Sequence, residues 1–433
     1  MNNPVKKPEL LLPAGTLDRL KTAFLYGADA VYAGMPAVSL RNKTSFTMDE
    51  MSEGITHAHR LGKKVYLTIN LFTHNQDIPK VEGFIQALND LKLDGVIVAD
   101  PGVFALMKEK CPNIPRHIST QANVCSALTT RFWQDQGASL CVLGREVSLA
   151  EIREIRSLCP DIKLEMFIHG ALCISYSGRC LLSNFMTGRS ANKGNCAHTC
   201  RWRYKVYEGQ SLSPNSSSPY YLEEETRPDQ LFRIDEDSHG SYIMNSRDLC
   251  LMPRLNEILP IGLDSFKIEG RNKSEYYTAI TAKAYRSAID DWFQSPDSWT
   301  PNSYMQELMT LQSRGYTVGF LDGNAGPEAQ NYDTPGSHGD WRFCGVVKAH
   351  KLNRMVIEVK HKICIGSVLE GISPHQQQAV KIPVSEIFDS ETQKNIETVS
   401  AGKCKQSVEI KVNSNIQEAL PPLSVLRVFD PEK

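Results

Sequence analysis

Short, almost continuously apolar segments alternate with segments whose apolar residues recur every three or four positions along the first 290 residues. The first kind predicts strands buried on both faces, and the second predicts amphipathic helices. Strands are predicted over residues 9–12, 30–34, 64–70, 95–100, 117–121, 139–143, 164–169 and 264–269. Because strands that alternate with helices form parallel sheets, we expect an α/β fold of the TIM-like (β/α)8 barrel type over residues 1–335.

The connection between the seventh and eighth strands is much longer than such a barrel needs. It predicts an insertion at about residues 171–262, on the face where barrels carry their active sites. Residues 323–339 are rich in Gly, Pro, Asn and Asp and predict a linker. The short β-rich segments that follow predict a small β-barrel domain over residues 340–433.

The composition excludes a strong electrostatic field of one sign over the whole protein, because 48 Lys and Arg residues balance 49 Asp and Glu residues. Any nucleic-acid binding must therefore depend on a local patch. No apolar run approaches the roughly 20 residues that span a bilayer, and the lysines near the start precede no long apolar core. We expect a cytoplasmic protein with no membrane contact.

Cysteines are concentrated in the predicted insertion, where four of the 12 fall within 28 residues and a fifth follows. Their spacings match neither the paired C-x2-C of zinc ribbons nor the C-x2-C-x2-C of bacterial ferredoxins. An iron–sulfur cluster, a zinc ion and unliganded buried thiols all remain open. The candidate metal ligands are Cys173, Cys180, Cys196, Cys200 and Cys250.

Polar residues occur in or just after several predicted strands, where the active sites of such barrels lie. Candidates for binding a substrate are Asn70, Gln121, Arg145, Lys267 and Arg271. Candidates for moving a proton are Glu165, His169 and Glu269. Each of them could instead make a structural hydrogen bond or ion pair at the rim.

Residues 171–205 carry Lys and Arg but no Asp or Glu, and aromatic residues lie among the cations. This composition is typical of surfaces that bind single-stranded RNA or RNA loops, although a solvated basic loop has it too. The candidate RNA-binding residues are Arg179, Arg189, Lys193, Arg201, Trp202 and Arg203.

The segment from Glu165 to Ser183 resembles the signature of the collagenase-like peptidase family of unassigned catalytic type, family thirty-two. The positions that match it are Glu165, Phe167, Gly170, Ala171, Leu172, Cys173, Gly178, Cys180, Leu182 and Ser183. Other stretches that are similar to the family include residues 119–123, 245–249 and 267–271. The resemblance covers nearly the whole chain.

Within the family, the chain looks most like the branch of tRNA hydroxylation proteins. This resemblance implies oxygen-independent 5-hydroxylation of the wobble uridine in the tRNA anticodon loop, with prephenate as the hydroxyl donor. It also implies a 4Fe–4S cluster on four of the five candidate cysteines. Because prephenate carries two carboxylates and arginine binds carboxylates through paired hydrogen bonds, we expect Arg145 and Arg271, at the ends of the sixth and eighth strands, to anchor it. The resemblance leaves any protein partner and the electron donor unspecified. A peptidase and a non-catalytic tRNA-binding or iron–sulfur partner protein remain as alternatives.

Overall fold

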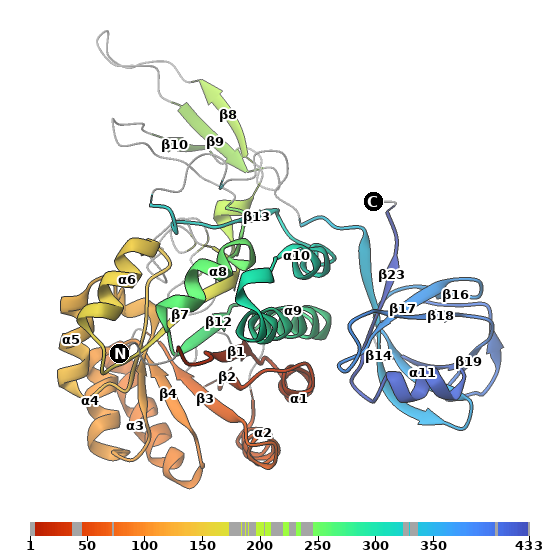
Figure 1. The fold of residues 1–433 in the computed structure, drawn as a ribbon, viewed down its shortest axis with the longest axis horizontal. Coiled ribbons are helices and arrows are strands. Elements are labelled where there is room, and N and C mark those ends of the chain that lie inside the picture. Colours follow the sequence, from red (N-terminus) through yellow and green to blue (C-terminus); the bar gives the residue numbers. More distant parts are fainter. Residues whose placement is uncertain are drawn as a thin grey trace.

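Eight parallel strands form the closed barrel of the N-terminal domain (Figure 1). The computed structural model describes residues 5–36, 46–71, 73–172, 183, 187, 189, 196–202, 204–208, 220–224, 231–234, 246–323, 329, 337–402 and 406–431. The barrel strands are β1 (Glu9–Pro13), β2 (Ala30–Gly34), β3 (Lys64–Ile69), β4 (Gly95–Val98), β5 (Arg116–Ile118), β6 (Leu140–Val142), β7 (Lys163–Gly170) and β12 (Ser265–Ile268). Strand β12 pairs with both β1 and β7 and so closes the barrel. The predicted TIM-like (β/α)8 barrel is confirmed.

Helices follow the barrel strands and pack around them (Figure 1). They are α1 (Leu17–Leu25), α2 (Met48–Arg60), α3 (Ile78–Ala87), α4 (Pro101–Lys110), α5 (Ala127–Gln136), α6 (Leu149–Leu158), α8 (Leu255–Ile258), α9 (Glu275–Gln294) and α10 (Asn302–Leu308). Polar N-caps fix where several of them begin. Thr47 and Ser148 each form a capping box with the glutamate three residues later, which satisfies backbone donors at both ends of the box.

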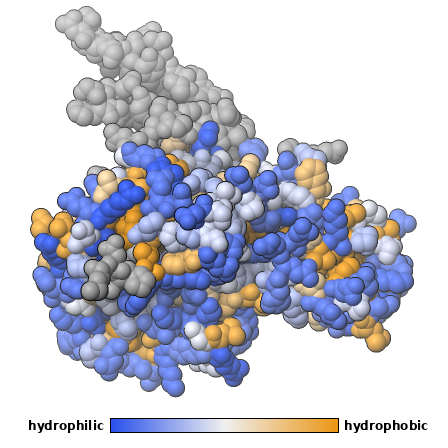
Figure 2. Space-filling view, viewed as in Figure 1, coloured by the Kyte–Doolittle hydropathy of each residue, from blue (hydrophilic) through white to orange (hydrophobic). Residues whose placement is uncertain are grey.

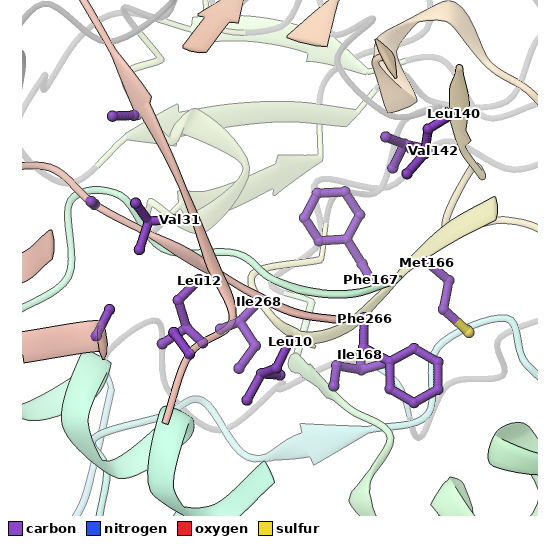
Figure 3. Close-up of a cluster of buried hydrophobic side chains, with 14 of the residues drawn as sticks. Leu10, Leu12, Val31, Leu140, Val142, Met166, Phe167, Ile168, Phe266 and Ile268 are labelled. Carbon is purple, nitrogen blue, oxygen red and sulfur yellow. The ribbon is translucent and has the colours of Figure 1, made fainter. Parts of the chain in front are cut away.

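The apolar core lies mainly between the strands and the helices, where alternate strand residues point outward. Figure 3 shows part of this packing, with Leu10, Leu12 and Val31 near Ile268 and Phe266. The barrel interior contains a smaller apolar cluster of Leu11, Ala30, Tyr32, Tyr66 and Ile97. The remaining inward positions are largely polar, so the interior can hold charged groups away from water.

Additional strands follow β7. Strand β11 (Asp248–Cys250) pairs antiparallel with β7 and parallel with β13 (Tyr316–Thr317). Strands β8 (Tyr204–Glu208), β9 (Tyr220–Glu224) and β10 (Leu231–Ile234) form a separate antiparallel sheet. Figure 1 shows that this sheet projects away from the barrel. The predicted insertion therefore contains both a projecting sheet and an extension of the barrel sheet.

The C-terminal domain is an antiparallel β structure around its own apolar core, in accord with the predicted all-β module. Its eight-stranded sheet has the order β18-β17-β23-β14-β15-β22-β19-β20. These strands are β14 (Trp341–Lys351), β15 (Arg354–Val359), β17 (Val368–Ile372), β18 (Val380–Pro383), β19 (Ile387–Asp389), β20 (Asn395–Ile396), β22 (Ser407–Lys411) and β23 (Val425–Phe429). A small sheet of β16 (Ile363–Cys364) and β21 (Thr398–Val399) and the helix α11 (Ser414–Ala419) complete the domain.

The two domains make specific polar contacts. The Tyr26 hydroxyl, on the barrel side, donates to the Ile372 carbonyl at 2.5 Å and accepts from the Val425 backbone N–H at 3.2 Å. Arg427 of β23 forms an ion pair with Glu307 of α10 at 2.9 Å. Tyr26 and Arg427 are both buried, and their contacts hold the β domain against α1, α9 and α10.

Hydrophilic residues cover most of the visible face of both domains, and apolar residues occur there in small groups (Figure 2). In the described part of the chain, no helix combines the length and the apolar character needed to cross a membrane.

Candidate active site at the barrel mouth

A buried ion pair lies inside the barrel between β7 and β12. Glu165 accepts hydrogen bonds from Lys267 Nζ at 2.9 Å and from Ser265 Oγ at 2.8 Å. The register explains the pairing, because Ser265 lies directly opposite Glu165 and Lys267 is the next inward residue on β12. Burial lowers the pKa of Lys267 despite the opposing attraction of Glu165, and nearby Arg271 and Arg145 lower it further. The predicted candidates Glu165, Lys267, Arg145 and Arg271 are therefore electrostatically coupled.

Aromatic rings support the cations of this cluster. Lys267 Nζ lies 4.5 Å from the ring centre of Tyr32 and 5.5 Å from that of Phe167. Arg145 packs its guanidinium 4.1 Å from the Phe167 ring centre and donates to the Ala171 carbonyl at 3.1 Å. Such contacts stabilise cations that have lost part of their hydration. The Phe167 ring thus contacts two cations, Arg145 and Lys267.

Two further contacts span the mouth of the barrel. Arg271, just after β12, donates to Thr68 Oγ1 of β3 at 2.7 Å. Asn70, just after β3, donates to Gln121 Oε1 at 2.7 Å, and Gln121 follows β5. The structure therefore brings the predicted residues Asn70, Gln121 and Arg271 together at the carboxyl ends of the strands.

His169 does not face this cluster. Its ring contacts the rings of Tyr277, Tyr285 and Tyr316, with ring centres 5.5–5.8 Å away. Its Nδ1 lies 3.4 Å from the Tyr285 hydroxyl. Burial, and then the charge of Lys273, lowers the pKa of His169 to about 3. The imidazole is therefore neutral at physiological pH, and its surroundings favour a structural role over proton transfer to a ligand in the mouth.

Glu269 lies at the junction of β12 with the following loop and is 9% exposed. Its backbone N–H donates to the His169 carbonyl at 2.9 Å, and its carbonyl accepts from the Tyr277 hydroxyl at 2.7 Å. Gly170 makes this close approach possible, because a Cβ there would lie 2.7 Å from the Glu269 carbonyl oxygen and its φ is 115°. Steric crowding by the Glu269 carbonyl thus explains why this position of the family signature is a glycine.

Cys196 and Cys200 lie in a turn that local hydrogen bonds define. The His198 backbone N–H donates to Cys196 Sγ at 3.3 Å, and His198 itself has a left-handed φ of 56°. Trp202 Nε1 donates to the Ala197 carbonyl at 3.1 Å. Both cysteines are partly exposed. Cys173 and Cys180 lie outside the described residues.

Cys250 differs from these two cysteines, because it lies in the core on β11 and is 1% exposed. Its Sγ is 3.6 Å from the Tyr285 hydroxyl and 3.7 Å from Met305 Sδ. Burial raises its pKa to about 11, which disfavours the thiolate that metals bind. Within the described residues, no three His, Cys, Asp or Glu side chains are grouped so that they could hold a metal ion.

The candidate RNA-binding residues are only partly described. Arg189 is exposed and Trp202 is half-buried. Arg201 lies in the short helix Thr199–Arg201, and its side chain is outside the description, as are Arg179, Lys193 and Arg203. The geometry of the predicted patch therefore rests on Arg189 and Trp202.

Sequence reasoning missed the aromatic and hydroxyl groups that complete the mouth. Tyr32, Thr68 and Phe167 all point inward and contact the cations. The alternation of inward and outward residues could have identified Thr68, since it lies on β3 two positions before Asn70.

Two family models cover nearly all of this architecture. Residues 15–331 match the model of peptidase family U32, and residues 339–427 match that of the peptidase family U32 C-terminal domain. The chain belongs to peptidase family U32, as the signature around Cys173 predicted.

Relatives within this class have more specific names. The chain is 41% identical over 397 residues to tRNA hydroxylation protein P of Escherichia coli (strain K12), covering 85% of this chain and 86% of that protein. It is 37% identical over 359 residues to tRNA hydroxylation protein P1 of Bacillus subtilis (strain 168), covering 82% and 81%. It is also 31% identical over 334 residues to the 23S rRNA 5-hydroxycytidine C2501 synthase of Escherichia coli (strain K12), covering 76% of this chain and 47% of that protein.

Proposed function

We propose that this chain is a tRNA-modifying enzyme that hydroxylates C5 of the wobble uridine without molecular oxygen. The observation that carries the proposal is its similarity, over 85% of its length, to a protein named for tRNA hydroxylation. The base would enter at the barrel mouth, and a wobble base is already unpaired, so little stacking energy is lost when it leaves the anticodon loop.

The chemistry requires an oxygen donor and an electron acceptor, because replacing C5–H by C5–OH withdraws two electrons from the base. We propose prephenate as the donor of the oxygen and a redox partner as the acceptor of the two electrons. Prephenate carries two carboxylates, and guanidinium groups bind carboxylates through paired hydrogen bonds. Arg145 and Arg271 lie where they could supply such contacts, close enough to Lys267 to lower its pKa.

We propose that a 4Fe–4S cluster, which would supply one-electron transfer when bound, is held by Cys173, Cys180, Cys196 and Cys200. Cys196 and Cys200 fit this role, because both are partly exposed and a backbone N–H already donates to the Cys196 sulfur. Cys250 does not fit, because it is enclosed by Tyr285 and Met305 and its pKa is raised. This assignment reduces five candidates to four. A zinc ion on the same thiolates is the alternative, and metal analysis of the purified protein would distinguish it from an iron–sulfur cluster.

The basic segment is proposed to contact the anticodon loop through its cations and Trp202. Arg189 is exposed, and its guanidinium lies 3.5 Å from the Cys196 carbonyl, so the proposed RNA contact is adjacent to the proposed cluster. Replacing Arg189 with Glu should weaken tRNA binding and reduce its salt dependence. Unchanged tRNA binding by this variant would indicate that the segment is a solvated basic loop with no contact to RNA.

Nucleoside analysis tests the proposal directly. The chain would be expressed in a bacterial strain that lacks its own tRNA hydroxylation protein, and digested tRNA would be analysed by mass spectrometry. We expect 5-hydroxyuridine derivatives to appear with the wild-type chain and to be absent with Cys196→Ala. Their absence with well-folded, iron-loaded wild-type chain would refute the proposal.

Peptidase activity has less support in the described residues. A cysteine protease needs a histidine that can accept a proton from the nucleophile. His169 is surrounded by three tyrosines and has a pKa of about 3, so it is a weak base.

A further inference from the structure

Two buried hydrogen-bond donors near the barrel mouth lack an acceptor. Gln121 is 4% exposed, and its Oε1 accepts from Asn70, while its Nε2 has no partner among the described residues. Arg145 Nε is likewise buried without a partner in the described part of the chain. A buried donor without an acceptor costs about 1–3 kcal/mol, so such donors are usually paired with a protein group, an ordered water or a ligand. Both donors belong to loops that follow neighbouring strands, β5 and β6.

The charge of Arg145 is also unmatched. Its contacts are the Ala171 carbonyl and the Phe167 ring, and no carboxylate of the described residues forms an ion pair with it. The neighbouring cation Lys267 differs in this respect, because Glu165 neutralises it at 2.9 Å. Arg145 thus supplies one positive charge that the described side chains leave for an anion.

We propose that Arg145 and Gln121 form a subsite for the carboxylate of a small organic acid at the mouth of the barrel. A carboxylate presents two acceptor oxygens in one plane, which suits a guanidinium and a primary amide that follow neighbouring strands. Its negative charge matches the positive charge of Arg145, with which no carboxylate of the described residues forms an ion pair. A phosphate ion fits less well, because it concentrates its charge on one tetrahedral group close to the Glu165 carboxylate, whereas a dicarboxylate places one charge on each planar group. The inference rests on the proposed function, in which an organic acid supplies the hydroxyl group.

The chain contains a matched control for Arg145. Arg116 also stacks on an aromatic ring, with its guanidinium 5.7 Å from the Phe104 ring centre, and also donates to backbone carbonyls. Its Nε is buried without a partner in the same way. It lies on β5 at the amino end of the barrel strands, opposite the proposed subsite. Substitution of Arg116 therefore tests the same loss of charge and packing without touching the mouth.

Isothermal titration of the purified chain with prephenate, malonate and inorganic phosphate tests the subsite without requiring catalysis. We expect saturable binding of prephenate, at least tenfold weaker binding by Arg145→Gln and Gln121→Leu, and unchanged binding by Arg116→Gln. Malonate should compete with prephenate better than phosphate does. Circular dichroism would show whether each variant folds. If Arg145→Gln does not fold, the affinity of Gln121→Leu for prephenate tests the subsite.

Several results would overturn the inference. They are no binding of prephenate, equal affinity in the wild type and the folded mouth variants, or equal weakening by Arg116→Gln. A loss of affinity for an isolated anticodon stem-loop, with prephenate binding unchanged, would instead make Arg145 a contact for RNA phosphate. These failures are distinct from failure of the proposed function, which nucleoside analysis reports separately.

Discussion

Replacing Lys267 with Met should strongly destabilise the barrel. The side chains of Lys267 and Glu165 are 5% and 1% exposed, so the substitution leaves a carboxylate away from water with Ser265 as its remaining donor among the described residues. Removing one partner of such a buried pair costs about 3–5 kcal/mol. Because Met has nearly the length of the Lys stem, lost packing contributes little, and the unpaired charge dominates.

Urea denaturation followed by far-UV circular dichroism measures this loss. With a denaturant slope of about 3 kcal/mol per molar, the midpoint should fall by roughly 1–2 M. The matched control is Lys21→Met, whose partner Glu53 is 58% exposed, and it should cost about 0–1 kcal/mol. The double variant Glu165→Gln with Lys267→Met should recover part of the loss. Equal midpoints for the two single lysine variants, or no recovery in the double variant, would contradict the reasoning.

Three further predictions concern other parts of the site. Gly170→Ala should lower the thermal midpoint more than Gly62→Ala, because both glycines have positive φ but only the Cβ at position 170 meets a backbone carbonyl, at 2.7 Å. Cys196→Ala should reduce iron and sulfide in anaerobically purified protein, whereas Cys250→Ala should retain both; the reverse pattern would reassign the ligands. Burial lowers the pKa of His169 from 6.5 to about 3, so the unfolded state binds its proton first and stability should fall as the pH decreases from about 6.5 to 3. His169→Phe should flatten that dependence in pH-dependent urea titrations, and an unchanged slope would argue against a buried neutral imidazole.

The barrel could be predicted because strands buried on both faces are apolar along their whole length, as in β2 and β4. The predicted ends of the strands were less accurate than their positions. The fourth strand was predicted to reach Asp100, but β4 ends at Val98 and Asp100 caps α4 by accepting from the Gly102 and Val103 backbone N–H groups. A polar residue after a strand can either continue it or begin the next helix, and the sequence does not distinguish these choices.

The site was predictable in position but not in pairing. Polar residues after strands had to meet at one rim, yet the contact between Glu165 and Lys267 joins residues 102 positions apart and depends on register. His169 illustrates the limit. Alternation from Glu165 and Phe167 would turn it inward, but the register shifts between Lys267 and Ile268, and the imidazole packs against Tyr277 and Tyr285 of α9. An irregularity of one residue is invisible in the pattern.

The Tyr26 hydroxyl, which bonds to two strands of the C-terminal domain at once, has a consequence for large ligands. A hinge would let the two domains adapt their separation to whatever lies across them. Here hydrogen bonds and an ion pair already join the two domains, so a molecule that touches both must fit the spacing that these contacts hold, or break them. Selection by size and shape can then operate away from the barrel mouth.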